Sequence, residues 1–226
     1  MRSLRPAEGR GTETGPVVDR GRLGYRAGLR LQQDLAARRG RGEIGDTLLL
    51  CGHPPVLTLG THADPGHILA SPAELAARGI EVHRCDRGGQ VTWHGPGQVV
   101  GYVIADLRPR RRDVHRFCRD LEEIMIRTLA DHGLEGTREQ GRTGVWIGGR
   151  KVGALGVRVR RWITTHGFAL NVDCDLGAYE RIIPCGIFDR GVTSMRAARG
   201  RPVARGTVCA ALARHFLEIF GGQGGA

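Results

Sequence analysis

Three strand-like segments in close succession constrain the fold more than any other feature of this sequence. Residues 143–147, 151–160 and 164–172 are apolar and β-branched in character, and Gly148-Gly149 between the first two is typical of a two-residue hairpin turn. Shorter apolar runs upstream predict further strands at 47–51, 56–59, 80–84, 91–93 and 99–105. So many short strands predict a substantial β-sheet.

Helical patterns are interspersed among these strands. Residues 25–38, 113–132 and 207–220 carry apolar side chains at helical spacing, and Ser71 opens a fourth helix with a proline and a capping glutamate. The order lacks regular strand–helix–strand alternation, so we expect an α+β fold with a mixed β-sheet flanked by helices. A chain of 226 residues suits one domain, here 16–220, between a disordered lead-in (1–15) and a flexible tail (221–226).

Charge and cysteine content exclude several classes of protein. The net charge of +11 favours anionic partners, but the arginines are scattered with few aromatic residues between them, which disfavours nucleic-acid binding. Six cysteines without a C-x-x-C pair argue against a zinc site or a secreted disulfide framework. The sequence has neither a membrane-span pattern nor a signal-peptide pattern, so we expect a cytoplasmic protein without membrane contact.

Lys151 is the only lysine in the chain, and the other 33 of the 34 basic residues are arginine. An arginine side chain carries charge as well as a lysine does, but it does not release its proton in a protein. A single lysine among so many arginines therefore indicates a position that needs a titratable amine, although chance survival of one lysine explains the count as well.

Three motifs carry polar groups beside glycines. Residues 87–98 contain four glycines, a proline, and the possible donors Arg87, Thr92, His94 and Gln98, which favours a ligand site over a glycine-rich hairpin with a structural histidine. Residues 148–156 place Lys151 at the start of a strand among small side chains. Residues 181–187 set Cys185 between a proline and a glycine, in a shaped loop, so Cys185 is the best candidate nucleophile among the six thiols.

These motifs resemble the lipoyl(octanoyl) transferase family over about residues 21–220. The resemblance is carried by H-P-P-V-x-T-L-G at 53–60, R-G-G-x-x-T-W-H-G-P-G-Q at 87–98, and K-V-G-A-L-G, T-H-G-F-A-L-N-V-D and I-I-P-C-G-I within 144–194. It implies the catalytic-domain fold shared by biotin and lipoate protein ligases, and makes 16–220 an octanoyltransferase catalytic domain. Cys51-Gly52 stands before His53 where relatives often have a glutamate, and the N-terminal extension has no evident counterpart.

The resemblance also implies a two-step acyl transfer. Cys185 takes octanoyl from octanoyl-acyl carrier protein, Lys151 lowers the pKa of that thiol, and the target lysine amine then attacks the acyl-enzyme. The implied acceptors are the lipoyl domains of 2-oxoacid dehydrogenases and the glycine cleavage H protein, and no metal or cofactor is implied. The implied substrate-binding residues are Arg87, Gly88, Gly89, Gln90, Val91, Thr92, Trp93, His94, Ala154, Leu155, Gly156, Gly167, Phe168 and Ala169.

Two other functions remain open on the sequence. An ATP-dependent lipoate or biotin ligase on the same fold activates a free acid as an adenylate and needs no thiol. A catalytically inactive module that binds acyl groups or nucleic acid is compatible with the basic charge. Acyl chain-length preference, the modified proteins and the oligomeric state are not encoded in any pattern that we identify.

Overall fold

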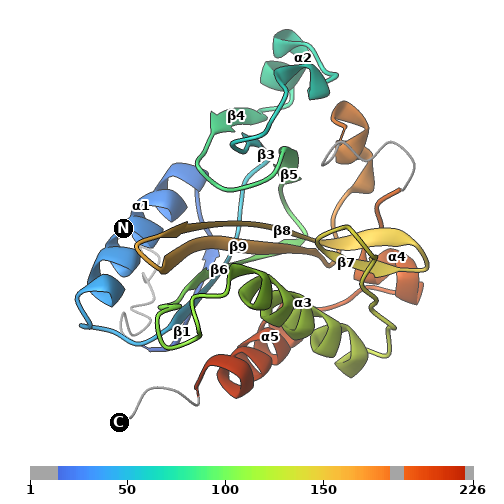
Figure 1. Ribbon diagram of the computed structural model, residues 1–226. Coiled ribbons are helices and arrows are strands. Elements are labelled where there is room, and N and C mark those ends of the chain that lie inside the picture. Colours follow the sequence, from blue (N-terminus) through green and yellow to red (C-terminus); the bar gives the residue numbers. More distant parts are fainter. Residues whose placement is uncertain (1–14, 184–190, 222–226) are drawn as a thin grey trace, which may run out of the picture.

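A computed structural model describes residues 15–183 and 191–221 (Figure 1). Its main sheet has six strands in the order β1-β2-β6-β9-β8-β7. The β1–β2 pair is parallel and the other pairs are antiparallel, so the predicted mixed sheet is confirmed. Its strands are β1 (Val17–Arg22), β2 (Thr47–Gly52), β6 (Gln98–Ile104), β7 (Val145–Ile147), β8 (Arg150–Arg160) and β9 (Ile163–Asn171).

Helices cover both faces of this sheet and make a three-layer α+β domain. Helix α1 (Tyr25–Gly40) lies on one face, where Leu35 joins a core with Ile104 of β6. Helices α3 (Val114–Asp131) and α5 (Arg205–Phe220) pack together on the opposite face (Figure 1). Because helices cover both faces, every residue of β6 is buried.

A smaller sheet stands over β8 and β9 on the side of α1 (Figure 1). It has the order β4-β3-β5, with β3 (Val56–Leu59), β4 (Glu81–Arg84) and β5 (Val91–His94). The amide of Gly88 donates to the Val157 carbonyl at 2.9 Å and ties the segment before β5 to β8. The remaining helices are α2 (Pro72–Ala77), α4 (Met195–Arg199) and two short 3-10 turns at Pro65–His67 and Leu176–Arg181.

Local sequence signals match the structure closely. Gly148 and Gly149 have φ values of 54° and 72°, as a type I′ hairpin requires, and the capping box of Ser71 with Glu74 is present. The helix predicted at 25–38 extends to Gly40, and strand ends differ from the predictions by one or two residues. Strand β1 and helix α4 were not predicted, because each is short and has little apolar periodicity.

Residues 1–14 and 222–226 lie outside the described residues, so the lead-in and tail remain predictions.

Candidate active site

A narrow cavity lies between β8 and β9 of the main sheet and the smaller sheet above them. Most of the predicted binding residues line it: Arg87, Gly89, Gln90, Thr92, His94, Ala154, Leu155, Gly156, Gly167, Phe168 and Ala169. Residues far apart in sequence thus meet at one cavity, because β8 and β9 are paired and the 87–94 segment crosses above them.

Strand alternation separates the remaining predicted residues from the cavity. Thr92 and His94 of β5 line it, whereas Val91 and Trp93 pack into the core of the smaller sheet. Successive side chains of β5 point to opposite faces, so Val91 and Trp93 face away from the cavity that Thr92 and His94 line. Gly88 is also absent from the lining and serves in the backbone link to Val157.

Small side chains form the floor of the cavity. Ala154 pairs with Ala169 and Gly156 pairs with Gly167 across β8 and β9. A Cβ atom on Gly156 would lie 2.9 Å from Cδ of Arg87, so only glycine leaves this width. The result is a narrow slot with an apolar floor, the apolar slot.

Arg87 is hydrogen-bonded through its guanidinium to neighbouring groups of the protein, so it does not present a free charge to the cavity. Its side chain is buried, and its guanidinium donates to the Thr58 hydroxyl at 2.8 Å and to the carbonyls of Thr58 and Gln90, both at 2.7 Å. These bonds hold the 87–90 segment against β3. Sequence reasoning predicted a ligand contact here, and the structure gives Arg87 an additional scaffolding role.

The described lining also contains Tyr25, Val100, Tyr102 and His166, which were not predicted as binding residues although His166 lies in the T-H-G-F-A-L-N-V-D motif. Behind them, His53 donates from Nδ1 to the Leu23 carbonyl at 2.6 Å and therefore accepts from the Tyr102 hydroxyl at Nε2, at 2.7 Å. The H-P-P motif contained His53, but its partners lie far away in sequence. The unusual Cys51 is fully buried, and its Sγ lies 3.6 Å from Nε2 of His53.

The histidines and tyrosines around the cavity are held neutral. Burial lowers the pKa of His94 to about 3 and that of His166 to about 4, and it also lowers the pKa of His53. Burial raises the pKa of Tyr25 and Tyr102 far above the usual value for a phenol. At neutral pH these five side chains therefore add hydrogen-bonding groups without adding charge.

Lys151 lines a second, smaller cavity that shares Thr92, Ala154 and Ala169 with the first. Its ammonium Nζ lies 5.1 Å from the centre of the Trp146 ring, within the range of a cation–π contact. Asn171 and Tyr179 line the same cavity, and the Tyr179 hydroxyl lies 3.0 Å from the Asn171 Oδ1. The single amine of the chain is thus placed at one end of the apolar slot.

The predicted nucleophile, Cys185, lies outside the described residues. Its described flanks are anchored: the Ile183 amide donates to the His67 carbonyl at 2.8 Å, and the Gly191 carbonyl accepts from the Lys151 amide at 3.0 Å. After Gly191, Val192 pairs with Lys151 in a parallel bridge. Gly191 and Val192 therefore lie beside the strand that carries Lys151.

Burial makes most of the described thiols poor nucleophiles. It raises the pKa of Cys51 and Cys174 to about 12 and that of Cys209 to about 11, and it also raises the pKa of Cys118. Cys85 donates to the Leu59 carbonyl from an Sγ 3.4 Å away.

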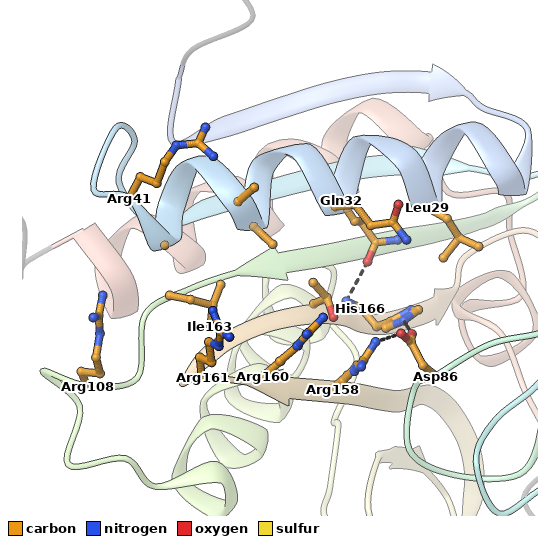
Figure 2. Close-up of a pocket in the computed structure, with 15 residues that line it drawn as sticks. Leu29, Gln32, Arg41, Asp86, Arg108, Arg158, Arg160, Arg161, Ile163 and His166 are labelled. Carbon is orange, nitrogen blue, oxygen red and sulfur yellow. Dashed lines mark hydrogen bonds and ion pairs between the residues drawn. The ribbon is translucent and has the colours of Figure 1, made fainter.

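On the far side of His166 lies a wider groove between α1 and the β8–β9 hairpin, with a volume of about 650 Å³ (Figure 2). Its lining includes Arg41, Arg108, Arg158, Arg160 and Arg161. Among the residues that the structure describes, Asp86 is the only carboxylate in this lining, and it pairs with Arg158 and His166. The sequence indicated scattered arginines, and the fold gathers these five into one groove.

Within 15–183 and 191–221, no cluster of three or more His, Cys, Asp or Glu side chains is arranged to hold a metal ion. No helix in those ranges is long and apolar enough to cross a membrane.

Comparison with known proteins gives consistent matches. Residues 24–217 match the family model of the lipoyl protein ligase A/B catalytic domain. The chain is 51% identical over 203 residues to an octanoyltransferase of Chloroflexus aurantiacus, covering 88% of this chain and 91% of that protein. It is 44% identical to an octanoyltransferase of Alkaliphilus metalliredigens, covering 90% of this chain and 94% of that protein.

Solved structures support the fold. A lipoate-protein ligase A bound with ATP superposes with a TM-score of 0.71 and 18% identity, covering 91% of this chain and 85% of that one. A bi-partite lipoate protein ligase from Thermoplasma acidophilum gives a TM-score of 0.66 and 18% identity, with coverage of 91% and 83%. Together these likenesses confirm the predicted ligase-type catalytic-domain fold.

Proposed function

Because the chain belongs to the lipoyl protein ligase A/B catalytic-domain family, with octanoyltransferases among its relatives, we propose that it transfers octanoyl groups in protein lipoylation. The donor is octanoyl-acyl carrier protein. The acceptor is a lysine amine on a lipoyl domain, of the kind found in 2-oxoacid dehydrogenases and the glycine cleavage H protein. The observation that carries the proposal is the apolar slot that ends beside Lys151.

The reaction has two balanced steps in this proposal. The Cys185 thiolate attacks the carbonyl carbon of the donor thioester, a thioester to Cys185 forms, and the bond to the carrier's sulfur breaks. That sulfur takes a proton from the Lys151 ammonium and departs as a thiol, which leaves Lys151 as a neutral amine. The acceptor amine then attacks the Cys185 thioester, an amide bond forms, and Cys185 leaves as a thiolate. The proton lost by the amine passes to the enzyme, so neither ATP nor a metal ion enters the balance.

Lys151 has two tasks in this scheme. As an ammonium it stabilises the Cys185 thiolate, whose free form has a pKa near 8.5 and would be mostly protonated at neutral pH. As a neutral amine it accepts the proton from the attacking lysine. Arginine can perform the first task but not the second, which accounts for a single lysine in a chain rich in arginine.

The electrostatics of the slot support an acyl chain as its occupant. Its floor is alanine and glycine, and the buried histidines around it are neutral. A hydrocarbon chain therefore enters without separating a charged group from water. In this proposal the carboxyl end of the chain lies near Lys151, supported by the Thr92, Ala154 and Ala169 side chains that line both cavities.

Intact-protein mass spectrometry after mixing with octanoyl-acyl carrier protein tests the proposal. One octanoyl adduct is expected on the unmodified enzyme and on Cys85→Ala, and none on Cys185→Ala. An adduct that persists in Cys185→Ala contradicts the assigned nucleophile. Transfer that requires ATP and free octanoate, and survives Cys185→Ser, assigns the protein to the ATP-dependent ligases.

A further inference from the structure

His166 occupies a strained position in the middle of the sheet. It lies in β9, opposite Val157 of β8, and its φ is +59°. This left-handed conformation is unfavourable for a residue other than glycine, above all inside a strand. Backbone strain of this kind persists only where surrounding contacts enforce it, and it is concentrated at functional positions.

Two contacts hold His166 in place (Figure 2). Its backbone amide donates to Oε1 of the buried Gln32 on α1 at 2.7 Å, and its Nε2 lies 2.8 Å from Oδ1 of Asp86. Asp86 is held in turn by Arg158 of β8. The imidazole is therefore fixed between α1 and β8, with only 4% of the residue exposed.

This side chain separates two spaces. It lines both the apolar slot and the arginine-lined groove, and no other described residue is common to the two linings. Ala154 borders the Lys151 cavity, and Val157 of the same strand lies opposite His166. The two residues are three positions apart, which is about 10 Å along the strand. That length matches an extended octanoyl chain, whereas a dodecanoyl chain is longer.

We infer that His166 is the end wall that sets the acyl chain length accepted by this enzyme. The inference rests on the proposed function and adds a residue that determines specificity. A longer chain would have to displace an imidazole held by Asp86, or push its methyl end among the arginine side chains beyond. Because the groove beyond the wall is already open, removing this one side chain joins the two spaces.

Replacing His166 with glycine is the direct test, because glycine adopts a positive φ without strain. The ratio of kcat/KM for dodecanoyl over octanoyl thioester donors is expected to rise at least tenfold. His166→Asn, which tolerates the left-handed conformation but is shorter than histidine, is expected to give an intermediate ratio. Arg111→Gly is the matched control, since Arg111 has a φ of 59° on the exposed surface and lines neither space.

A binding measurement separates this inference from the proposed function. Calorimetric affinities of octanoate and dodecanoate are compared for the unmodified protein and His166→Gly, with dodecanoate expected to gain at least tenfold relative to octanoate. An unmodified enzyme that transfers no octanoyl group contradicts the proposed function, and the binding data then decide the role of His166 alone. An unchanged preference in His166→Gly, in transfer or in binding, overturns the inference.

Discussion

The slot and the groove on the two sides of His166 are built on the same strands but offer opposite chemistry. One face of β8 carries Ala154, Gly156, Arg158 and Arg160 in turn. The first two line the slot, and the two arginines line the groove. Every second residue of a strand faces the same side, so the change occurs within one row of side chains. A shared sheet therefore carries a slot whose one charged side chain among the described lining residues, Arg87, is bonded to Thr58 and Gln90, and a groove lined by five arginines; a buried imidazole divides the two.

Because the proposed reaction takes place at the slot, we expect a substitution of Lys151 to have the largest effect on the rate of octanoyl transfer. Lys151→Arg is predicted to reduce octanoyl transfer by about 100-fold or more, because general acid–base catalysis contributes that much and arginine keeps its proton. Single-turnover transfer to a lipoyl domain measures the loss. Arg150→Lys, at the exposed neighbouring position, is the control and should stay close to the unmodified rate. Near-normal turnover in Lys151→Arg would refute the need for a titratable amine.

Because the histidines beside the slot are buried in neutral form, we expect acid to lower the free energy of unfolding. The arginines of the groove stay charged and add no such pH dependence. The folded-state pKa values of His94 and His166, about 3 and about 4, lie below the unfolded value near 6.5. Below pH 6.5 the unfolded chain binds protons at these histidines that the folded chain does not bind, so the free energy of unfolding falls as the pH drops. At pH 5 each histidine should cost about 2 kcal/mol of unfolding free energy.

Urea unfolding followed by circular dichroism at pH 7 and pH 5 measures this loss. His166→Asn removes one of the two buried groups and is expected to show a smaller loss between the two pH values. Equal stability of the unmodified protein at pH 7 and pH 5 would mean that these imidazoles are not held neutral by burial.

The smallest effect is expected on the groove side. Arg160→Ala/Arg161→Ala removes two exposed side chains at the hairpin end of the groove. Exposed substitutions usually change free energies by no more than about 0.5 kcal/mol, so transfer from a small octanoyl thioester should change about twofold or less. A tenfold loss with this small donor would show that the groove takes part in the chemistry and would remove the contrast between the two sides.

Much of the fold was predictable because its signals are local. The Gly148-Gly149 turn, the Ser71 capping box and the apolar face of α3 each depend on residues within one or two turns of each other. The second hairpin turn, at Arg161 and Trp162, also has two positive φ values but contains no glycine, so its composition does not predict a turn.

The site was predictable only in its contiguous motifs. The segments that contribute Arg87, Thr92, His94 and the 154–156 and 167–169 stretches were recognised, but the alternation that excludes Val91 and Trp93 from the slot was not. Tyr25 and Tyr102 were missed because each is an ordinary residue of a helix or strand. Nothing in their immediate neighbourhood distinguishes them from core side chains.

The local elements, the single lysine at position 151 and the family motifs can be read from the sequence alone. His166 lies between the slot and the groove only because distant segments pack together. Its two partners, Asp86 and Gln32, lie 80 and 134 residues away in the chain. Periodicity and turn chemistry act over a few residues, whereas the packing of a wall depends on which distant side chains the sheet and helix α1 bring together.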